Sequence, residues 1–353
     1  MKFGVINILK AGAAQLIVLH HLAFYGPMAD HLRHILPELV DWLAGSARIA
    51  VQVFLVVGGF LAAKSLAPNA QPGSADPLGA IWRRYIKLAP PFLAATLVAA
   101  LATALASRWM THDSLSDPAT LGQLAAHALL LHSVLGYPSL SAGAWYVAID
   151  FQLYALAVAM LWLAGRRAWM VPGLVALGCA LSLLHFNLDP DWDNWAPYFF
   201  GSYGLGMAAW WAGDPRRKAG SMLLLMAVCM LALVALAIDF RSRLALALVV
   251  ACVLVLFGRM RTGGEGRAWA SVNWLAQISY AVFLIHFPVC LLVNAAFTRF
   301  VPADPALQGL GVLTAWAASL AAGALFYRLV EVPLGRLFQA PAAAPAGAVA
   351  RGA

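Results

Sequence analysis

The sequence predicts an all-α membrane protein, a polytopic bundle of about ten transmembrane helices without a soluble domain. Of its 353 residues, 63% are hydrophobic and only 11% are charged, whereas a soluble domain carries about 25% charged residues. The mean hydropathy is +0.79. Apolar runs of about 20 residues, each long enough to cross a bilayer, recur along almost the whole chain. A soluble fold has no interior large enough to bury so much apolar surface.

Ten apolar segments are expected to cross the membrane. The first follows Met1 and Lys2 and ends at Tyr25 without the small-residue cleavage site of a signal peptide, so we expect it to be retained as a helix. Each later segment is separated from the next by a short connection, and many connections carry Lys or Arg. The expected spans are residues 5–24, 43–63, 85–106, 144–163, 169–184, 196–211, 221–238, 244–257, 272–297 and 309–329.

An eleventh apolar segment, residues 121–135, is short for a span and carries two histidines. If it does not cross, both termini share one side with Lys64, Arg83, Arg84, Lys87, Arg166, Arg167, Arg216, Arg217, Lys218, Arg259, Arg261 and Arg267. The opposite side then receives Asp30, Glu38, Asp41, Asp113, Asp117, Asp189, Asp191 and Asp193. Because Lys and Arg favour cytoplasmic loops, this sorting predicts ten spans with both termini cytoplasmic. The loop with Arg241 and Arg243 fits the scheme least.

Other features of the composition point to no additional class of function. The net charge of +8 comes from the loop clusters, so it does not indicate nucleic-acid binding. The four cysteines lie inside apolar runs and show neither metal-ligand nor disulfide spacing, so no metal is expected. Residues 1–338 are predicted to form a single transmembrane domain, and the Ala- and Pro-rich tail 339–353 is predicted to be disordered.

Several ionisable or strongly polar residues lie inside the expected spans, where such groups are costly and mark candidate functional sites. They are Lys10, His20, His21, Arg48, Gln52, Asp150 and His286. A histidine can act as a general base near neutral pH, and a carboxylate can fix its tautomer. His20 and His21 point about 100° apart on a helix, so periodicity alone does not select between them. The alternative is that these groups only join helices by hydrogen bonds.

A basic segment opens the third expected span. Arg83, Arg84 and Lys87 lie within one helical turn and form a local cationic surface. Such a surface can bind phosphate groups, and arginine can do so with two parallel hydrogen bonds. The alternative is an ordinary anchor that contacts lipid headgroups.

Six features in the same order resemble the acyltransferase 3 family of bacterial integral-membrane acyltransferases. Five of the family's patterns are VDVFFVLSGF, RRxxRxxP, WSLxxExxFY, SYxxYLxHxP and YxxVExPxxR. The similar segments here are VQVFLVVGGF (51–60), RRYIKLAP (83–90), WYVAIDFQLY (145–154), ISYAVFLIHFP (278–288) and YRLVEVPLGR (327–336). The family's first helix carries an arginine eleven residues before its essential histidine. Lys10 and His21 have this spacing, so the resemblance selects His21 over His20.

The chain also departs from these patterns at five positions. It has Lys10 and Lys87 where the family has Arg, Gln52 for Asp, Gly58 for Ser, and Asp150 for Glu. The two lysines keep the positive charge but lose the bidentate fork of arginine. Gln52 loses a negative charge, and Asp150 keeps one on a shorter side chain.

The resemblance implies an acyltransferase of the bacterial cytoplasmic (inner) membrane, with acyl-CoA, preferably acetyl-CoA, as co-substrate and a hydroxyl of an envelope or exported carbohydrate as acceptor. His21 is the expected catalytic base, and Asp150 is expected to orient it or stabilise its charge. The CoA phosphates are expected at Arg83, Arg84, Lys87 and Lys10. The thioester or the sugar is expected at Gln52, Trp145, Gln152, Tyr154 and His286. Membrane lipids are further expected partners, and homo-oligomerisation stays open.

Three alternatives remain at this point. His21 can itself be acylated, so that the reaction proceeds in two steps. A transporter or flippase of an acyl group or lipid-linked sugar would also place polar residues at mid-membrane, although no pair of corresponding halves is visible in the sequence. A purely structural scaffold would not depend on His21.

Overall fold

Long helices make up most of the protein. The computed structural model describes residues 4–71, 76–165, 167, 169–216, 219–260 and 266–338, and this part of the chain contains helices and no strand. The long helices are α1 (Gly4–Phe24), α4 (Val51–Leu66), α5 (Pro77–Ala106), α7 (Ala144–Ala164), α8 (Met170–Leu184), α9 (Ala196–Ala212), α10 (Ala219–Ile238), α11 (Ser242–Phe257), α12 (Arg267–Phe300) and α13 (Pro305–Phe326). The short helices are α2 (Pro27–Arg33), α3 (Pro37–Gly45), η1 (Ala47–Ala50), α6 (Leu121–Ala128), η2 (Phe186–Leu188), η3 (Pro190–Trp192), η4 (Tyr327–Glu331) and α14 (Val332–Phe338).

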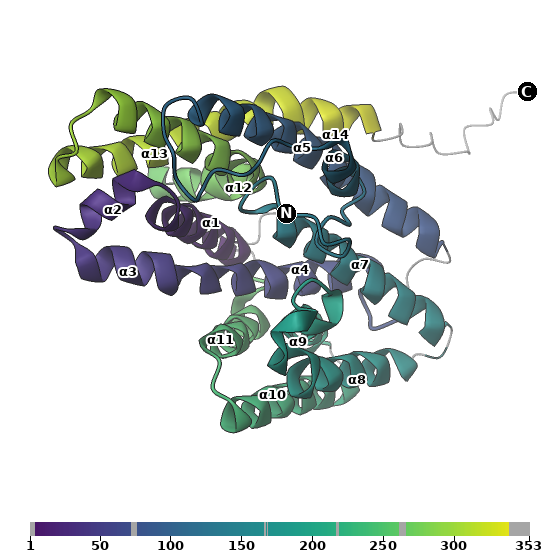
Figure 1. Cartoon of the computed structure of the whole chain (residues 1–353). Helices are drawn as coiled ribbons and strands as arrows, with labels where there is room; N and C mark the ends of the chain where they lie inside the picture. The colour runs from purple at the N-terminus through teal and green to yellow at the C-terminus, as the bar shows by residue number, and fades with distance from the viewer. Residues whose placement is uncertain are drawn as a thin grey trace, which may run out of the picture.

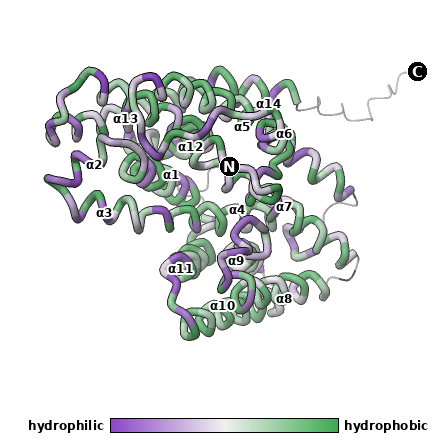
Figure 2. The backbone as a smooth tube through the Cα atoms, in the orientation of Figure 1, coloured by the Kyte–Doolittle hydropathy of each residue, from purple (hydrophilic) through white to green (hydrophobic). Residues whose placement is uncertain are grey.

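Each of the ten long helices overlaps one of the ten expected spans, although α4 begins at Val51 rather than at residue 43, because the preceding residues belong to α3 and η1. Within the described residues, eight helical segments are long and apolar enough to cross a membrane, and α11 is a shorter apolar helix. The tenth, α9, has 17 residues, nearly all of which are buried in the bundle. Figure 2 shows hydrophobic residues along most of each long helix, with hydrophilic residues at α2 and in the connections. The prediction of an all-α membrane protein is therefore confirmed.

The doubtful segment 121–135 forms only one short helix. The eight residues of α6 span about 12 Å, far less than a bilayer core. A capping box starts this helix: the Thr120 hydroxyl accepts from the Gln123 backbone N–H at 3.2 Å, and the Gln123 side chain bonds back to Thr120. The chain turns at Leu130, which has a φ of 58°. This geometry agrees with a bundle of ten spans rather than eleven.

The centre of the bundle is the close contact between α4 and α9, with α8 and α10 along one edge and α13 along the opposite edge (Figure 1). Two glycines allow this approach. A Cβ atom on Gly59 would lie 1.9 Å from the carbonyl oxygen of Tyr203, and one on Gly206 would lie 1.9 Å from that of Val56. Small residues that let backbones touch are typical of helix pairs in membranes.

Replacing Gly206 by alanine is expected to destabilise the protein by about 1–3 kcal/mol, because a backbone atom cannot move aside as a side chain can. The control is Gly173→Ala on α8, where a Cβ would meet no atom within 4 Å and the change should be neutral or favourable. Thermal unfolding of detergent-solubilised protein, followed by size-exclusion chromatography, compares the two variants. Equal midpoints would contradict a backbone contact at Gly206.

Successive spans run in opposite directions, so the charged connections gather at two ends of the bundle. The end that includes Lys64, Arg83, Arg259 and the start of α1 is called the basic end. There, the indole N–H groups of Trp210 and Trp211 donate to the carbonyls of Pro68 and Ala67. The end formed by α2, α3 and the connections before α6, α7, α9 and α11 is called the acidic end. Four basic residues of the predicted sorting and the tail lie outside the described residues, namely Arg166, Arg217, Lys218, Arg261 and residues 339–353.

Candidate active site

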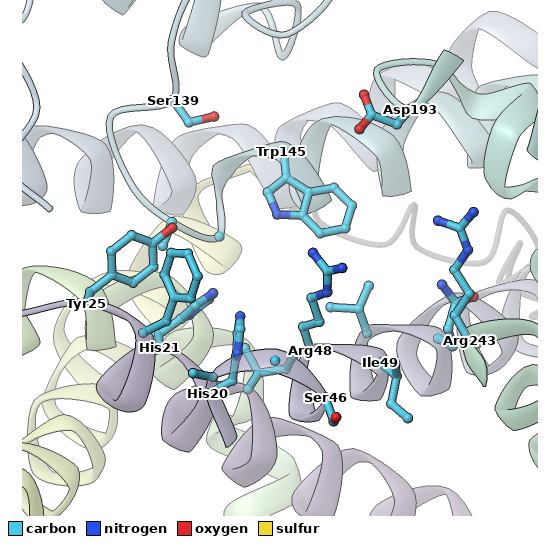
Figure 3. A pocket seen from close by; sticks show the side chains of 18 of the residues that line it. His20, His21, Tyr25, Ser46, Arg48, Ile49, Ser139, Trp145, Asp193 and Arg243 are labelled. Carbon is cyan, nitrogen blue, oxygen red and sulfur yellow. The ribbon is translucent and has the colours of Figure 1, made fainter. Parts of the chain in front are cut away.

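A cavity of about 840 Å³ lies at the acidic end. It is bounded by the last turns of α1, by η1 and the start of α4, by the connections before α6, α7 and α9, and by the start of α11. His20 and His21 project into it from one wall, and Trp145 from another (Figure 3). The cavity therefore brings together segments from across the whole sequence at the level of the histidines.

His21 and His286 form a buried hydrogen-bonded pair between α1 and α12. His21 Nδ1 lies 2.6 Å from His286 Nε2, and His286 Nδ1 lies 3.1 Å from the carbonyl oxygen of Val282. A carbonyl only accepts, so we assign the hydrogen of His286 to Nδ1, which leaves Nε2 as an acceptor. His21 must then donate through Nδ1–H. Its Nε2 keeps a free lone pair, as a general base requires.

His20 lines the same cavity from the neighbouring position. Its Nδ1 lies 2.9 Å from the carbonyl oxygen of Leu43, so by the same argument its Nε2 is also unprotonated. The ring centroids of His20 and His21 are 4.9 Å apart. The difference between them is the partner: a backbone carbonyl of α3 holds His20, whereas a second imidazole holds His21.

Asp150 makes no direct hydrogen bond to His21 among the described residues, so support of His21 by direct contact, one form of its expected role, is not what the structure shows. Its carboxylate accepts a hydrogen bond from the guanidinium of Arg84, and the two form a largely buried ion pair between α5 and α7. Arg84 also lies over the ring of Tyr154, 5.2 Å from the centroid. The hydrogen-bond partner of His21 is therefore His286, and not the carboxylate of Asp150 that we expected from the sequence.

The basic segment is divided by this ion pair. Arg84 faces the bundle interior, while Arg83 is exposed and lies 3.7 Å from Asp76. Lys87 is exposed, and together with Lys10 on α1 it lies within electrostatic reach of Glu331. The single cationic surface that the spacing suggests is thus split into the inward Arg84 and the exposed Arg83 and Lys87. Lys10 on α1 adds a further positive charge near Lys87.

The expected substrate-binding residues also separate into two groups. Gln52 and Trp145 line the cavity. Gln152 instead fixes the start of α9, because its Oε1 accepts from the Ala196 N–H at 3.0 Å and its Nε2 donates to the carbonyl of Asn194 at 3.3 Å. Tyr154 packs beneath Arg84, so neither Gln152 nor Tyr154 lines the cavity.

Three arginines line the cavity, and none of them was assigned a catalytic or binding role from the sequence, although Arg48 was among the polar residues of the expected spans. Arg48 lies on η1 and extends into the cavity (Figure 3); its charge inside an apolar run was the available signal. Arg243 belongs to the loop that fitted the charge sorting least, and its guanidinium lies over the ring of Tyr198 at 4.8 Å. Burial raises the pKa of Asp193 on the cavity rim, and Arg243 opposes this shift. Arg243 lies on the side where the charge sorting predicts few basic residues, and this departure from the positive-inside pattern was the sequence signal for a residue of the cavity.

Comparison with known proteins agrees with the motif resemblance. The sequence profile of the acyltransferase domain family matches residues 3–328, nearly the whole chain. The chain is also similar to "Regulator of hypoxia-inducible factor 1" of Caenorhabditis elegans, with 26% identity over 173 residues, 44% of this chain. The chain spans only about one third of that relative, 33% of its length. No solved structure matches the chain.

Proposed function

The chain belongs to the acyltransferase 3 family, and we propose that it moves an acyl group, preferably acetyl, from acyl-CoA to a hydroxyl of an envelope or exported carbohydrate. One observation carries the proposal: the hydrogen-bonded pair of His21 and His286 at the cavity, which leaves the Nε2 atom of His21 as a base. A histidine whose second nitrogen is held by an acceptor is the arrangement used in acyl transfer to hydroxyl groups.

In the proposed reaction, His21 Nε2 removes the proton of the acceptor hydroxyl while its oxygen attacks the thioester carbonyl carbon. The C–S bond then breaks, CoA leaves as a thiolate, and the proton on His21 passes to the thiolate or to solvent. While His21 is protonated, its Nδ1–H continues to donate to His286 Nε2. That bond keeps the ring in place and stabilises the imidazolium.

The donor is proposed to enter from the basic end. Arg83, Lys87 and Lys10 supply positive charge for the CoA phosphates there, and the weak exposed contact of Arg83 with Asp76 does not oppose this, since such pairs contribute little. Arg84 is proposed to join α5 to α7 through Asp150 rather than to bind phosphate. Because Lys and Arg favour the cytoplasmic side, the basic end and both termini are proposed to face the cytoplasm of a bacterial inner membrane.

Sealed membrane vesicles test the donor and its side of entry. Labelled acetyl-CoA supplied to the basic-end side is expected to give labelled carbohydrate, and the same donor supplied to the acidic-end side none. Purified protein in detergent should still transfer label to added carbohydrate, because group transfer survives loss of the membrane whereas transport does not. Binding of acyl-CoA without any transfer in detergent would instead favour a transporter.

A further inference from the structure

The wall of the cavity next to the histidines carries an arginine without a partner of its own. Arg48 lies on η1, where the buried flanking residues Ala47 and Ala50 fix the turn. The long side chain is exposed to the cavity, and its guanidinium extends between His20 and Trp145 (Figure 3). Among the described residues, no hydrogen bond or ion pair engages this guanidinium. The five N–H groups of the Arg48 guanidinium are therefore available to a hydrogen-bond acceptor bound in the cavity.

Gln52, one turn further along the same wall, adds donors in a fixed orientation. Its Oε1 accepts a hydrogen bond from the Ser202 hydroxyl at 2.7 Å, and this buried contact holds the side chain in place. The amide NH2 of Gln52 is therefore the part left for the cavity. Where the acyltransferase 3 pattern has an aspartate, whose carboxylate only accepts hydrogen bonds, this chain has Gln52, whose amide NH2 can donate hydrogen bonds next to Arg48.

Among the described residues, no ion pair joins the two carboxylates of the cavity lining to Arg48. Asp193 and Asp113 belong to the connections before α9 and α6. The charge of Arg243 favours the ionised form of Asp193. Arg241 is fully engaged by the structure, since it donates to the carbonyls of Leu183, Ala235 and Asn187. Beside the basic Nε2 atoms of the histidines, this wall of the cavity therefore carries the N–H donors of Gln52 and the positive charge of Arg48.

From this arrangement we infer that the acyl acceptor carries an anionic oxygen group, a carboxylate or a phosphate, which Arg48 binds with two parallel hydrogen bonds and Gln52 with its amide. A planar fork of this kind fits either group. Binding there would place the acceptor hydroxyl against His21 Nε2 in the same cavity. The inference rests on the proposed function, because it assigns the charge of the acceptor that this function requires.

The binding test uses three small sugars of similar size, glucuronic acid, glucose 1-phosphate and glucose, titrated into the purified full-length protein by calorimetry. One or both anionic sugars are expected to bind roughly ten- to a hundredfold more tightly than glucose, the range of one or two charge-assisted hydrogen bonds. The stronger of the two identifies the acceptor as a uronate-bearing glycan or as a sugar phosphate. Equal affinity for all three sugars would overturn the inference.

Variants locate the effect. Arg48→Gln should remove the preference for the anionic sugars, and Arg48→Lys should keep part of it, since lysine retains the charge without the fork. The control Arg33→Gln removes a positive charge at the same end outside the cavity, where Arg33 pairs with Asp41 and Asp30, and should keep the full preference. An intact preference in correctly folded Arg48→Gln would contradict the assignment.

Transfer assays separate this inference from the proposed function. If labelled acetyl is transferred to glucose as readily as to the anionic sugars, the proposed acyl transfer is supported and the inference of an anionic acceptor is contradicted. If the anionic sugars bind through Arg48 but no acetyl is transferred to them or to glucose, the anion site stands and the proposed reaction fails.

Discussion

His21→Ala is expected to lower acyl transfer by about 10²- to 10⁴-fold, the contribution of a positioned general base. His20→Ala is expected to retain most of the activity, although His20 lines the same cavity. The difference follows from the partners of the two rings. His21 alone donates to a second imidazole that can stabilise its protonated form, while His20 bonds to a backbone carbonyl. Label transfer from acetyl-CoA into carbohydrate, at matched protein levels, measures both rates.

His286 provides the internal control for this prediction. In His286→Gln, the amide oxygen can accept from His21 Nδ1–H and hold its tautomer, so this variant should keep more activity than His286→Leu, which offers no acceptor. A burst of CoA release in the absence of carbohydrate would indicate that His21 itself is acylated. Equal label in wild type, His20→Ala and His21→Ala would remove His21 from the chemistry and favour the transporter or the scaffold.

The spans could be predicted because each depends on one segment of the chain. Apolar length and the side on which Lys and Arg lie are local properties, and they also predicted that residues 121–135 do not cross. The histidine pair could not be predicted in this way, since His21 and His286 are 265 positions apart. Hydropathy gives the depth of a residue in the membrane, but it does not say which helices are neighbours or which side chains face each other.

Asp150 illustrates the same limit. The sequence led us to expect that Asp150 supports His21, yet the packing of α5 against α7 gives it Arg84 as partner instead. Two departures from the family patterns also meet here: a Cβ on Gly58 would lie 3.6 Å from the Asp150 carboxylate and 3.3 Å from the ring of Tyr203. The chain has the smaller residue at both positions, and the structure places these two positions in contact although they are far apart in the sequence.

Asp150→Asn and Arg84→Gln are each expected to destabilise the protein by about 3–5 kcal/mol, because each leaves the opposite charge buried without its partner. Asp150 is only 6% exposed, so water cannot replace the lost contact. The matched control is Asp41→Asn at the acidic end. It breaks an exposed ion pair with Arg33, whose Nε lies 2.8 Å from the Asp41 carboxylate, and should cost less than about 1 kcal/mol. Thermal unfolding in detergent with size-exclusion chromatography measures all three.

The double variant Arg84→Met with Asp150→Leu separates stability from chemistry. It removes both charges while keeping apolar volume between α5 and α7, so it is expected to recover most of the stability that either single change loses. If the single variants are as stable as the wild-type protein, the ion pair does not support the fold. Arg84 would then again be a candidate for binding the phosphates of acyl-CoA. If the double variant folds normally but no longer transfers acyl groups, the charges serve the reaction as well, because packing alone would then be insufficient for activity.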